Sequence, residues 1–165
     1  MPEVTKNSEN LLFVTHEFVE YVKAEARNSS KLIARLLMHL SHKDLVQEML
    51  IAMCAGCVVV PNRAVGRSES LQVVEGEMLL ILFDGNGEVI KRVEMGPPES
   101  GKAFLYRFTS TPWHTMIPVT EMVVVHEALQ GPFEKSSEGL PEWVPNDAAD
   151  LKHFLKEILA RGGAV

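Results

Sequence analysis

Apolar residues recur at intervals of three and four through residues 11–26, the spacing that places side chains on one face of a helix. This stripe consists of Leu11, Val14, Phe18 and Val22. The polar run Asn-Ser-Ser at 28–30 interrupts it. A second segment, 44–53, repeats the helical spacing after Ser41, a residue type that caps helices. Its apolar face would carry Leu45, Met49 and Met53 and cover one face of a sheet.

From Cys57 onward the pattern changes to short apolar and β-branched runs separated by turn residues. These runs are typical of strands, and they are VVVP, SLQVVEG, MLLILFD, EVIKRVEM, AFLYRF, HTMIPV and EMVVVHEAL. Gly85-Asn86-Gly87 lies between two of them and predicts a hairpin, because Gly and Asn accept the positive φ of a tight turn. Many short strands at this interval favour a β-sandwich or a β-barrel.

The C-terminal part changes pattern again. Residues 131–146 are rich in Pro, Gly and charge and predict an ordered surface segment. A helix follows, with Asn146 or Asp147 as its cap. Its apolar stripe consists of Leu151, Phe154, Leu155 and Ile158.

Composition and charge limit the partners. The chain has 165 residues and is 46% hydrophobic, enough for the core of one domain. Its net charge of -6 argues against nucleic acid, whose binding depends on clustered Lys and Arg. No apolar run is long enough to span a bilayer, and the first ten residues lack the apolar stretch of a signal peptide. We therefore expect a small-molecule ligand or protein subunits as partners, no nucleic acid, no membrane and a cytoplasmic location.

The two cysteines, Cys54 and Cys57, are spaced as C-A-G-C. A redox pair with this spacing opens a helix after a strand, where the helix N-terminus lowers the thiol pKa. This pair instead follows a predicted helix and enters a Val-rich run. Small buried hydrophobic side chains are the preferred interpretation, and redox chemistry is the alternative. A structural zinc would need a second pair of ligands, which the sequence lacks.

The residues that follow Cys54 have the spacing of a metal-binding motif. In chain order they are Gly56, five residues, Asn62, one residue, Ala64, four residues, Glu69, six residues and Gly76, with His114 later in TSTPWHTM. This spacing resembles the cupin superfamily motif, which has His at the second and third positions, then Glu, and a last His in a later motif. The resemblance implies that Glu69 and His114 match two ligands, and that Asn62 and Ala64 replace the other two.

Three further segments narrow the resemblance. MHLSHKDLVQEMLIAM followed by CVVVPNR, then HEALQGPF, and PEWVP resemble the small WbuC-type cupin metalloproteins, over residues 31–146. This family implies a mainly β, cupin jelly-roll β-barrel with flanking helices, bacterial and dimeric. The expected organisation is a single domain, 1–165, with a helical N-terminal segment (1–55), a cupin barrel (56–130), and a Pro-rich loop and C-terminal helix (131–165).

The resemblance also implies a divalent transition metal, Fe, Mn, Zn or Ni, if any is bound. Glu69 and His114 alone would supply two protein ligands, where catalytic sites usually supply three or more. His39 and His126 are the possible replacements. Alternation along EMVVVHEAL lets only one of His126 and Glu127 face the interior, and the resemblance favours Glu127.

Without a metal, Glu69 and His114 could form a carboxylate–imidazole pair that acts as a general base, or a purely structural pair. We expect a pocket that binds a small polar molecule, such as a sugar derivative. Its predicted residues are Asn62, Ala64, Glu69, Leu71, Val73, Trp113 and His114. Trp113 as a core residue, a metal-dependent enzyme rebuilt around Glu69 and His114, and a noncatalytic partner protein remain the alternatives.

Overall fold

The computed structural model describes residues 3–6, 8–110, 112–133 and 140–160. The predicted surface segment 131–146 and the last residues of the predicted C-terminal part therefore lie partly outside the described residues. The elements are β1 (Glu3–Lys6), α1 (His16–Asn28), β2 (Ile33–Leu37), β3 (Val46–Cys54), β4 (Glu69–Glu75), β5 (Met78–Phe83), β6 (Val89–Met95), the 3-10 helix η1 (Pro98–Ser100), β7 (Leu105–Phe108), β8 (Trp113–Pro118), β9 (Met122–Gln130) and α2 (Ala148–Ala160).

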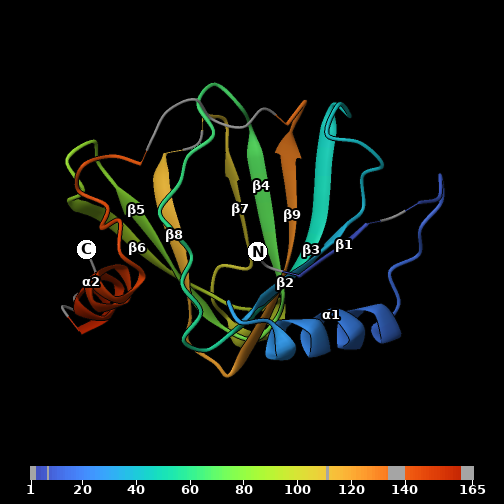
Figure 1. Ribbon diagram of the computed structural model, residues 1–165, viewed down its shortest axis with the longest axis horizontal. Helices are drawn as coiled ribbons and strands as arrows, with labels where there is room; N and C mark the ends of the chain where they lie inside the picture. The colour runs from blue at the N-terminus through green and yellow to red at the C-terminus, as the bar shows by residue number, and fades with distance from the viewer. Residues whose placement is uncertain (1–2, 7, 111, 134–139, 161–165) are drawn as a thin grey trace.

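The strands form two sheets that face one another (Figure 1). The six-stranded sheet has the order β1-β2-β3-β9-β4-β7, and the three-stranded sheet has the order β6-β5-β8. All of these neighbours are antiparallel except β1 and β2. The expected mainly β jelly roll with flanking helices is confirmed. In the described part of the chain, its two sheets do not join into one closed barrel.

The main core lies between the sheets. Ile51, Leu71 and Val125 from the larger sheet pack with Leu80 and Met116 from the smaller one, and all five are buried. Alternation along each strand puts every second side chain into this interior. The interior is therefore the place where side chains from both sheets can meet.

Helix α1 covers the outer face of the larger sheet (Figure 1). Val22 and Ala26 pack there against Leu50 and Val124. The predicted N-terminal helix is confirmed from His16 onward, and it ends at Asn28 as the polar run indicated.

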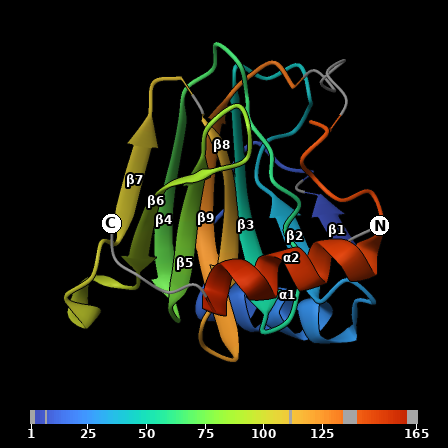
Figure 2. The same ribbon diagram turned by 90° about the vertical axis from the view of Figure 1, so that its left-hand side faces the viewer.

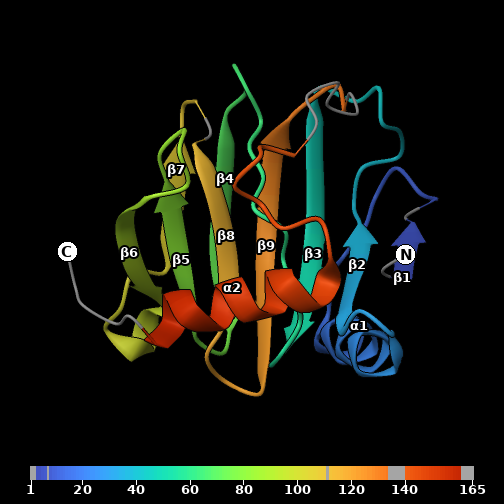
Figure 3. The ribbon, with the colours of Figure 1, turned by 60° about the vertical axis from the view of Figure 1, so that its left-hand side comes forward.

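Helix α2 covers the outer face of the smaller sheet (Figures 2 and 3). Leu151, Leu155 and Ile158 pack there against Ile81 and Phe83, which confirms the predicted C-terminal stripe. Neither of the two described helices is long and apolar enough to cross a membrane.

The helix predicted at 44–53 is wrong, and the predicted helical N-terminal segment (1–55) contains strands besides α1. Residues 46–54 form β3, and 33–37 form β2. Leu50 faces α1 and Ile51 faces the interior, so both faces of β3 are buried. A strand buried on both faces gives a continuous apolar run, which spacing alone cannot distinguish from a buried helix.

The hairpin predicted at residues 85–87 is confirmed between β5 and β6. Asp84 Oδ1 accepts the backbone N–H groups of Asn86 (2.8 Å) and Glu88 (2.9 Å), which holds the turn. Gly87 has a φ of 85°, and a Cβ there would lie 2.5 Å from the Trp143 ring. Only glycine fits this position without a shift.

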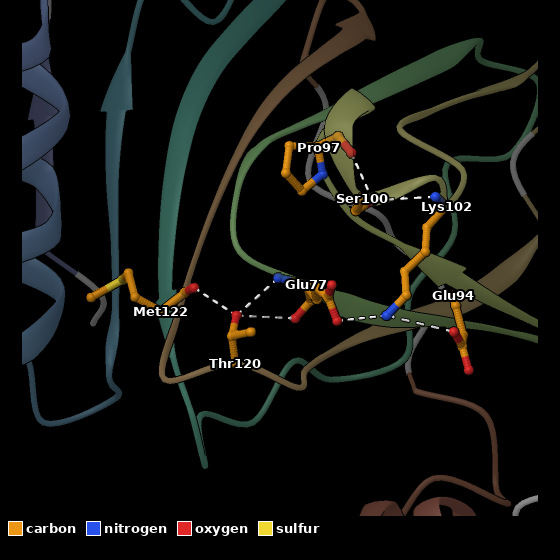
Figure 4. A network of polar contacts seen from close by, with 7 residues as sticks. All are labelled: Glu77, Glu94, Pro97, Ser100, Lys102, Thr120 and Met122. Carbon is orange, nitrogen blue, oxygen red and sulfur yellow. Dashed lines mark hydrogen bonds and ion pairs between the residues drawn. The ribbon is translucent and has the colours of Figure 1, made fainter.

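A polar network joins Glu77, which lies between β4 and β5, to Lys102 and Thr120 (Figure 4). Lys102 Nζ contacts Glu77 Oε2 at 2.5 Å and Glu94 Oε2 at 3.6 Å. Thr120 Oγ1 accepts the Glu77 N–H at 2.8 Å. Gly76, the last glycine of the motif, has a φ of 77°, and a Cβ there would lie 2.0 Å from the Met122 carbonyl oxygen. This glycine is therefore explained by chain packing.

Asp147, rather than Asn146, caps α2. Its Oδ1 accepts the N–H groups of Ala149 (2.7 Å) and Asp150 (3.3 Å). We expect Asp147→Ala to lower the free energy of unfolding by about 1 kcal/mol, because helix N–H groups lose their acceptor. Asn146→Ala is the matched control and should change it by less than about 0.5 kcal/mol. Urea unfolding checks both, and equal effects would contradict this assignment.

Candidate functional site

The interior carries charged groups among apolar ones near the start of β4. Glu69, Leu71 and Val73 alternate inward from this strand and are 4%, 1% and 0% exposed. Leu71 and Val73 belong to the main core, which agrees with their predicted place in the interior. Glu69 therefore presents its carboxylate to a largely dry space between the sheets.

His114 meets Glu69 from the opposite sheet. It lies on β8, is 2% exposed, and its backbone pairs with that of Asn62. Nε2 lies 3.4 Å from Glu69 Oε1, and Nδ1 lies 3.0 Å from the Pro112 carbonyl oxygen. The two residues that matched the family's surviving ligands are thus brought together.

Tyr106 completes this group, although it was not among the residues predicted from the sequence. Its hydroxyl donates to Glu69 Oε1 at 2.5 Å, and its ring lies 4.4 Å from that of Phe108, centroid to centroid. Both aromatic residues come from β7, which pairs with β4. A tyrosine two positions from Phe108 in a short apolar strand was the available hint, since a buried hydroxyl needs a partner.

The pKa values favour an ion pair between Glu69 and His114. Burial raises the pKa of Glu69, but the hydrogen bond and charge of His114, with the Tyr106 hydroxyl, outweigh it and hold the pKa below the ordinary value. Burial lowers the pKa of His114, but Glu69 and the Pro112 carbonyl outweigh it and raise the pKa. Both ring nitrogens face oxygen acceptors, which also fits a doubly protonated imidazolium.

Two further charged residues, Glu127 and Arg35, point into the same interior. Glu127 pairs with Leu71 across β9 and β4, and Arg35 pairs with Ile51 across β2 and β3, so each shares the inward face of a core residue. Both are half-buried. Neither side chain makes a hydrogen bond or ion pair with another residue in the described part of the chain.

Burial, the largest cause, and the nearby Glu69 carboxylate together raise the pKa of Glu127 to about 7, against the lowering effects of Arg35 and His114. Burial lowers the pKa of Arg35, while the charge of Glu127 raises it. Glu127 can therefore exchange a proton near neutral pH. A guanidinium keeps its proton under such conditions.

The remaining predicted pocket residues are placed differently. Asn62 has an exposed side chain whose Nδ2 donates to the Val60 carbonyl at 3.1 Å, and Ala64 is buried. Trp113 lies on the opposite face of β8 from His114 and packs in the α2 cluster, with its ring 5.9 Å from that of Trp143. The prediction that Trp113 forms a wall of the interior is therefore wrong. Its alternative interpretation as a core residue agrees with its place in the cluster under α2.

The two possible replacement ligands lie on the outer face of the larger sheet. His126 faces outward, as the resemblance favoured, and its Nε2 is 3.3 Å from Glu48 Oε1. His39 Nδ1 lies 2.9 Å from the Glu48 carbonyl oxygen. His39 lines a separate cavity of about 430 Å³ that Val46 and Glu48 also border. Neither histidine can join Glu69 and His114.

The described residues do not fit the transition-metal centre that the family resemblance implies. Within them, no group of three or more His, Cys, Asp or Glu side chains could hold a metal ion. Glu69 and His114 contact each other, and both His114 nitrogens face protein oxygens. A metal would have to break this pair to gain two ligands.

The cysteines are packing residues. Cys54 belongs to the α1 cluster, whereas Cys57 belongs to the main core, and both thiols are free and buried. Burial raises the pKa of Cys57 to about 12 and also raises that of Cys54. Such thiols are poor nucleophiles, which supports the hydrophobic interpretation over redox chemistry.

Comparisons with known proteins add no function. Residues 14–95, slightly less than half of the chain, match a family described as a domain of unknown function, DUF6016. No curated protein matches the sequence.

Solved structures resemble the chain at low identity. A protein of Shewanella oneidensis has a TM-score of 0.50 and 10% identity, over 61% of this chain and 68% of its own. An HTH_3 family transcriptional regulator of Vibrio cholerae has a TM-score of 0.48 and 18% identity over 69% of this chain, which spans 60% of that protein. The Cupin_2 domain of an XRE family transcriptional regulator from Enterobacter cloacae has a TM-score of 0.46 and 17% identity, over 61% and 98%. Sheet order and a shared interior make the present chain a mainly β jelly roll.

Proposed function

We propose that this chain binds a small polar molecule, such as a sugar derivative, between its two sheets, through protein side chains and without a metal ion. The observation that carries the proposal is the inward Glu127 carboxyl, which has no hydrogen-bond partner in the described part of the chain and lies beside the Glu69–His114 pair. Its side chain is half-buried, so the carboxyl keeps a face that a ligand can reach. A carboxyl without a protein partner at such a place is a candidate for ligand contact.

The chemistry of the interior favours a ligand with hydroxyl groups. Tyr106 and His114 both contact Oε1 of Glu69, so Oε2 is available to accept a hydrogen bond. Glu127 offers a second carboxyl group on the neighbouring strand. Carboxylates accept hydrogen bonds, and hydroxyls donate them.

Glu69 would be held in place by its two protein contacts. His114 and Tyr106 both hold the carboxylate at Oε1. Such a preorganised acceptor loses little conformational freedom when a ligand binds. In this account the pair that matches the family's metal ligands serves as a rigid polar anchor.

The resemblance to WbuC-type cupins, the homodimer, and a bacterial, cytoplasmic setting remain part of this proposal. Sedimentation of the full chain tests the dimer. A monomer at all concentrations would remove that part and leave the binding proposal intact.

Ligand-observed NMR tests the proposal, with a mixture of neutral sugars, polyols and sugar acids added to the full chain. At least one compound should show saturation transfer, and Glu127→Ala should abolish it. The matched control is Gln72→Ala on β4, whose side chain lies on the outward face. Transfer that survives in Glu127→Ala but is lost in Gln72→Ala would contradict an interior site.

A further inference from the structure

We infer that the ligand of this interior carries an anionic group, a carboxylate or a phosphate, and that Arg35 binds it. This inference rests on the proposed function, because it names the class of molecule that the same interior would accept. It follows from the position of Arg35, from its missing partner, and from the charges around it.

Arg35 extends from β2 into an apolar part of the interior. It pairs with Ile51 and lies two positions from Ile33 on the same inward face, and both isoleucines belong to the main core. The side chain is half-buried. A charged group in such surroundings loses much of its hydration. This loss disfavours the charged form and lowers the pKa of Arg35.

The protein does not compensate this charge with an ion pair. Glu127 is the carboxyl whose charge acts on Arg35, but no ion pair joins the two residues. Glu69 already contacts His114 and Tyr106. A guanidinium stays charged, because it does not lose its proton in a protein. Its planar N–H donors match two oxygens of a carboxylate or phosphate. A ligand anion would supply the missing partner.

The net charge of the interior agrees with an anion. His114 and Glu69 cancel as an ion pair. When Glu127 is protonated, the charge of Arg35 is not cancelled, and the net charge of these interior groups is +1. The groups that face Glu127 are Arg35 from β2, Glu69 from β4, Tyr106 from β7 and His114 from β8. An anion beside Arg35 would repel an ionised Glu127, so binding should draw a proton onto this carboxyl.

The test uses calorimetry on the full chain with three probes: gluconate, glycerol phosphate and neutral sorbitol. At least one of the two anions should bind about tenfold more tightly than sorbitol. Arg35→Gln should remove this advantage. The matched control, Arg107→Gln, changes an arginine that bonds Ser70 on the outward face and should leave binding unchanged.

Repeating the titration at about pH 8 in buffers of different ionisation heat measures proton uptake. Wild type should take up a proton with the anion, and Glu127→Gln should bind without uptake. Thermal unfolding should show that Arg35→Gln is folded, since it removes an uncompensated charge.

The outcomes separate the two proposals. Sorbitol binding as tightly as both anions, with no effect of Arg35→Gln, would overturn the anion inference and leave the proposed function standing. Binding of none of the three probes would overturn the anion inference, and the ligand-observed screen would then decide the proposed function independently. Anion binding that falls equally in Arg107→Gln would place the anion on the outer surface and also overturn the inference.

Discussion

Replacing Glu69 with alanine is expected to lower the free energy of unfolding by about 3 kcal/mol at about pH 5.5. Glu69 and His114 side chains are only 6% and 2% exposed, so the variant leaves a buried imidazole and the Tyr106 hydroxyl without their acceptor. Breaking a buried pair costs roughly 3–5 kcal/mol, and the lower figure applies because His114 can lose its proton.

The choice of pH follows from the two pKa shifts. The pKa of Glu69 lies below 4.5, so its stabilising effect is complete above 4.5 and is lost as the pH falls through its folded value. The pKa of His114 lies above 6.5, so its effect is complete below 6.5 and is lost as the pH rises through its folded value. Both contributions are complete between these limits.

A matched His–Glu pair on the outer face provides the control. Glu48 lies 3.3 Å from His126, but these side chains are 43% and 34% exposed. Glu48→Ala should cost less than about 1 kcal/mol, because water screens the pair. Chemical unfolding measures both variants. Equal losses would show that Glu69 and His114 do not form a buried ion pair.

Glu127→Gln is expected to stabilise the protein by about 2–3 kcal/mol at about pH 8. The folded pKa is about 7 against an ordinary 4.5, so between these values the folded state binds more protons than the unfolded state. Stability therefore falls as the pH rises from 4.5 to 7, and each pKa unit corresponds to about 1.4 kcal/mol. Glutamine has no proton to lose and should remove this slope.

Glu99→Gln, an exposed position in η1, serves as the control and should retain the wild-type slope. Unfolding free energies from about pH 5 to pH 8 compare the three proteins. A Glu127→Gln variant that is less stable than wild type at every pH would mean that Glu127 has a structural partner. The expected gain in stability instead marks a carboxyl retained for function at the expense of stability.

Elements marked by a capping residue, an apolar stripe or turn glycines could be predicted from the sequence. Asp147 and the stripe that follows it indicated α2, and the glycines at 85–87 indicated the hairpin. Segment 46–54 could not be assigned, because burial on both faces hides the alternation of a strand.

The candidate site was predictable only in part, for reasons of register. Spacing identified Glu69 and His114, which do meet. Trp113 was misplaced because a shift of one residue reverses the face of a strand side chain. Tyr106 comes from a strand that only the folded sheet brings beside the pair, and Arg35 comes from another strand of the same sheet, so no spacing along the chain could have identified them.

The protonation of the His114 ring tests the central claim most directly, which is that Glu69 and His114 form an ion pair rather than part of a metal centre. Nitrogen-15 NMR of the histidine rings at about pH 7, with and without added zinc, measures it. We predict protons on both His114 nitrogens and no change with zinc, with the assignment checked by loss of the signal in His114→Gln. An unprotonated Nε2 whose shift moves on zinc addition would contradict this account.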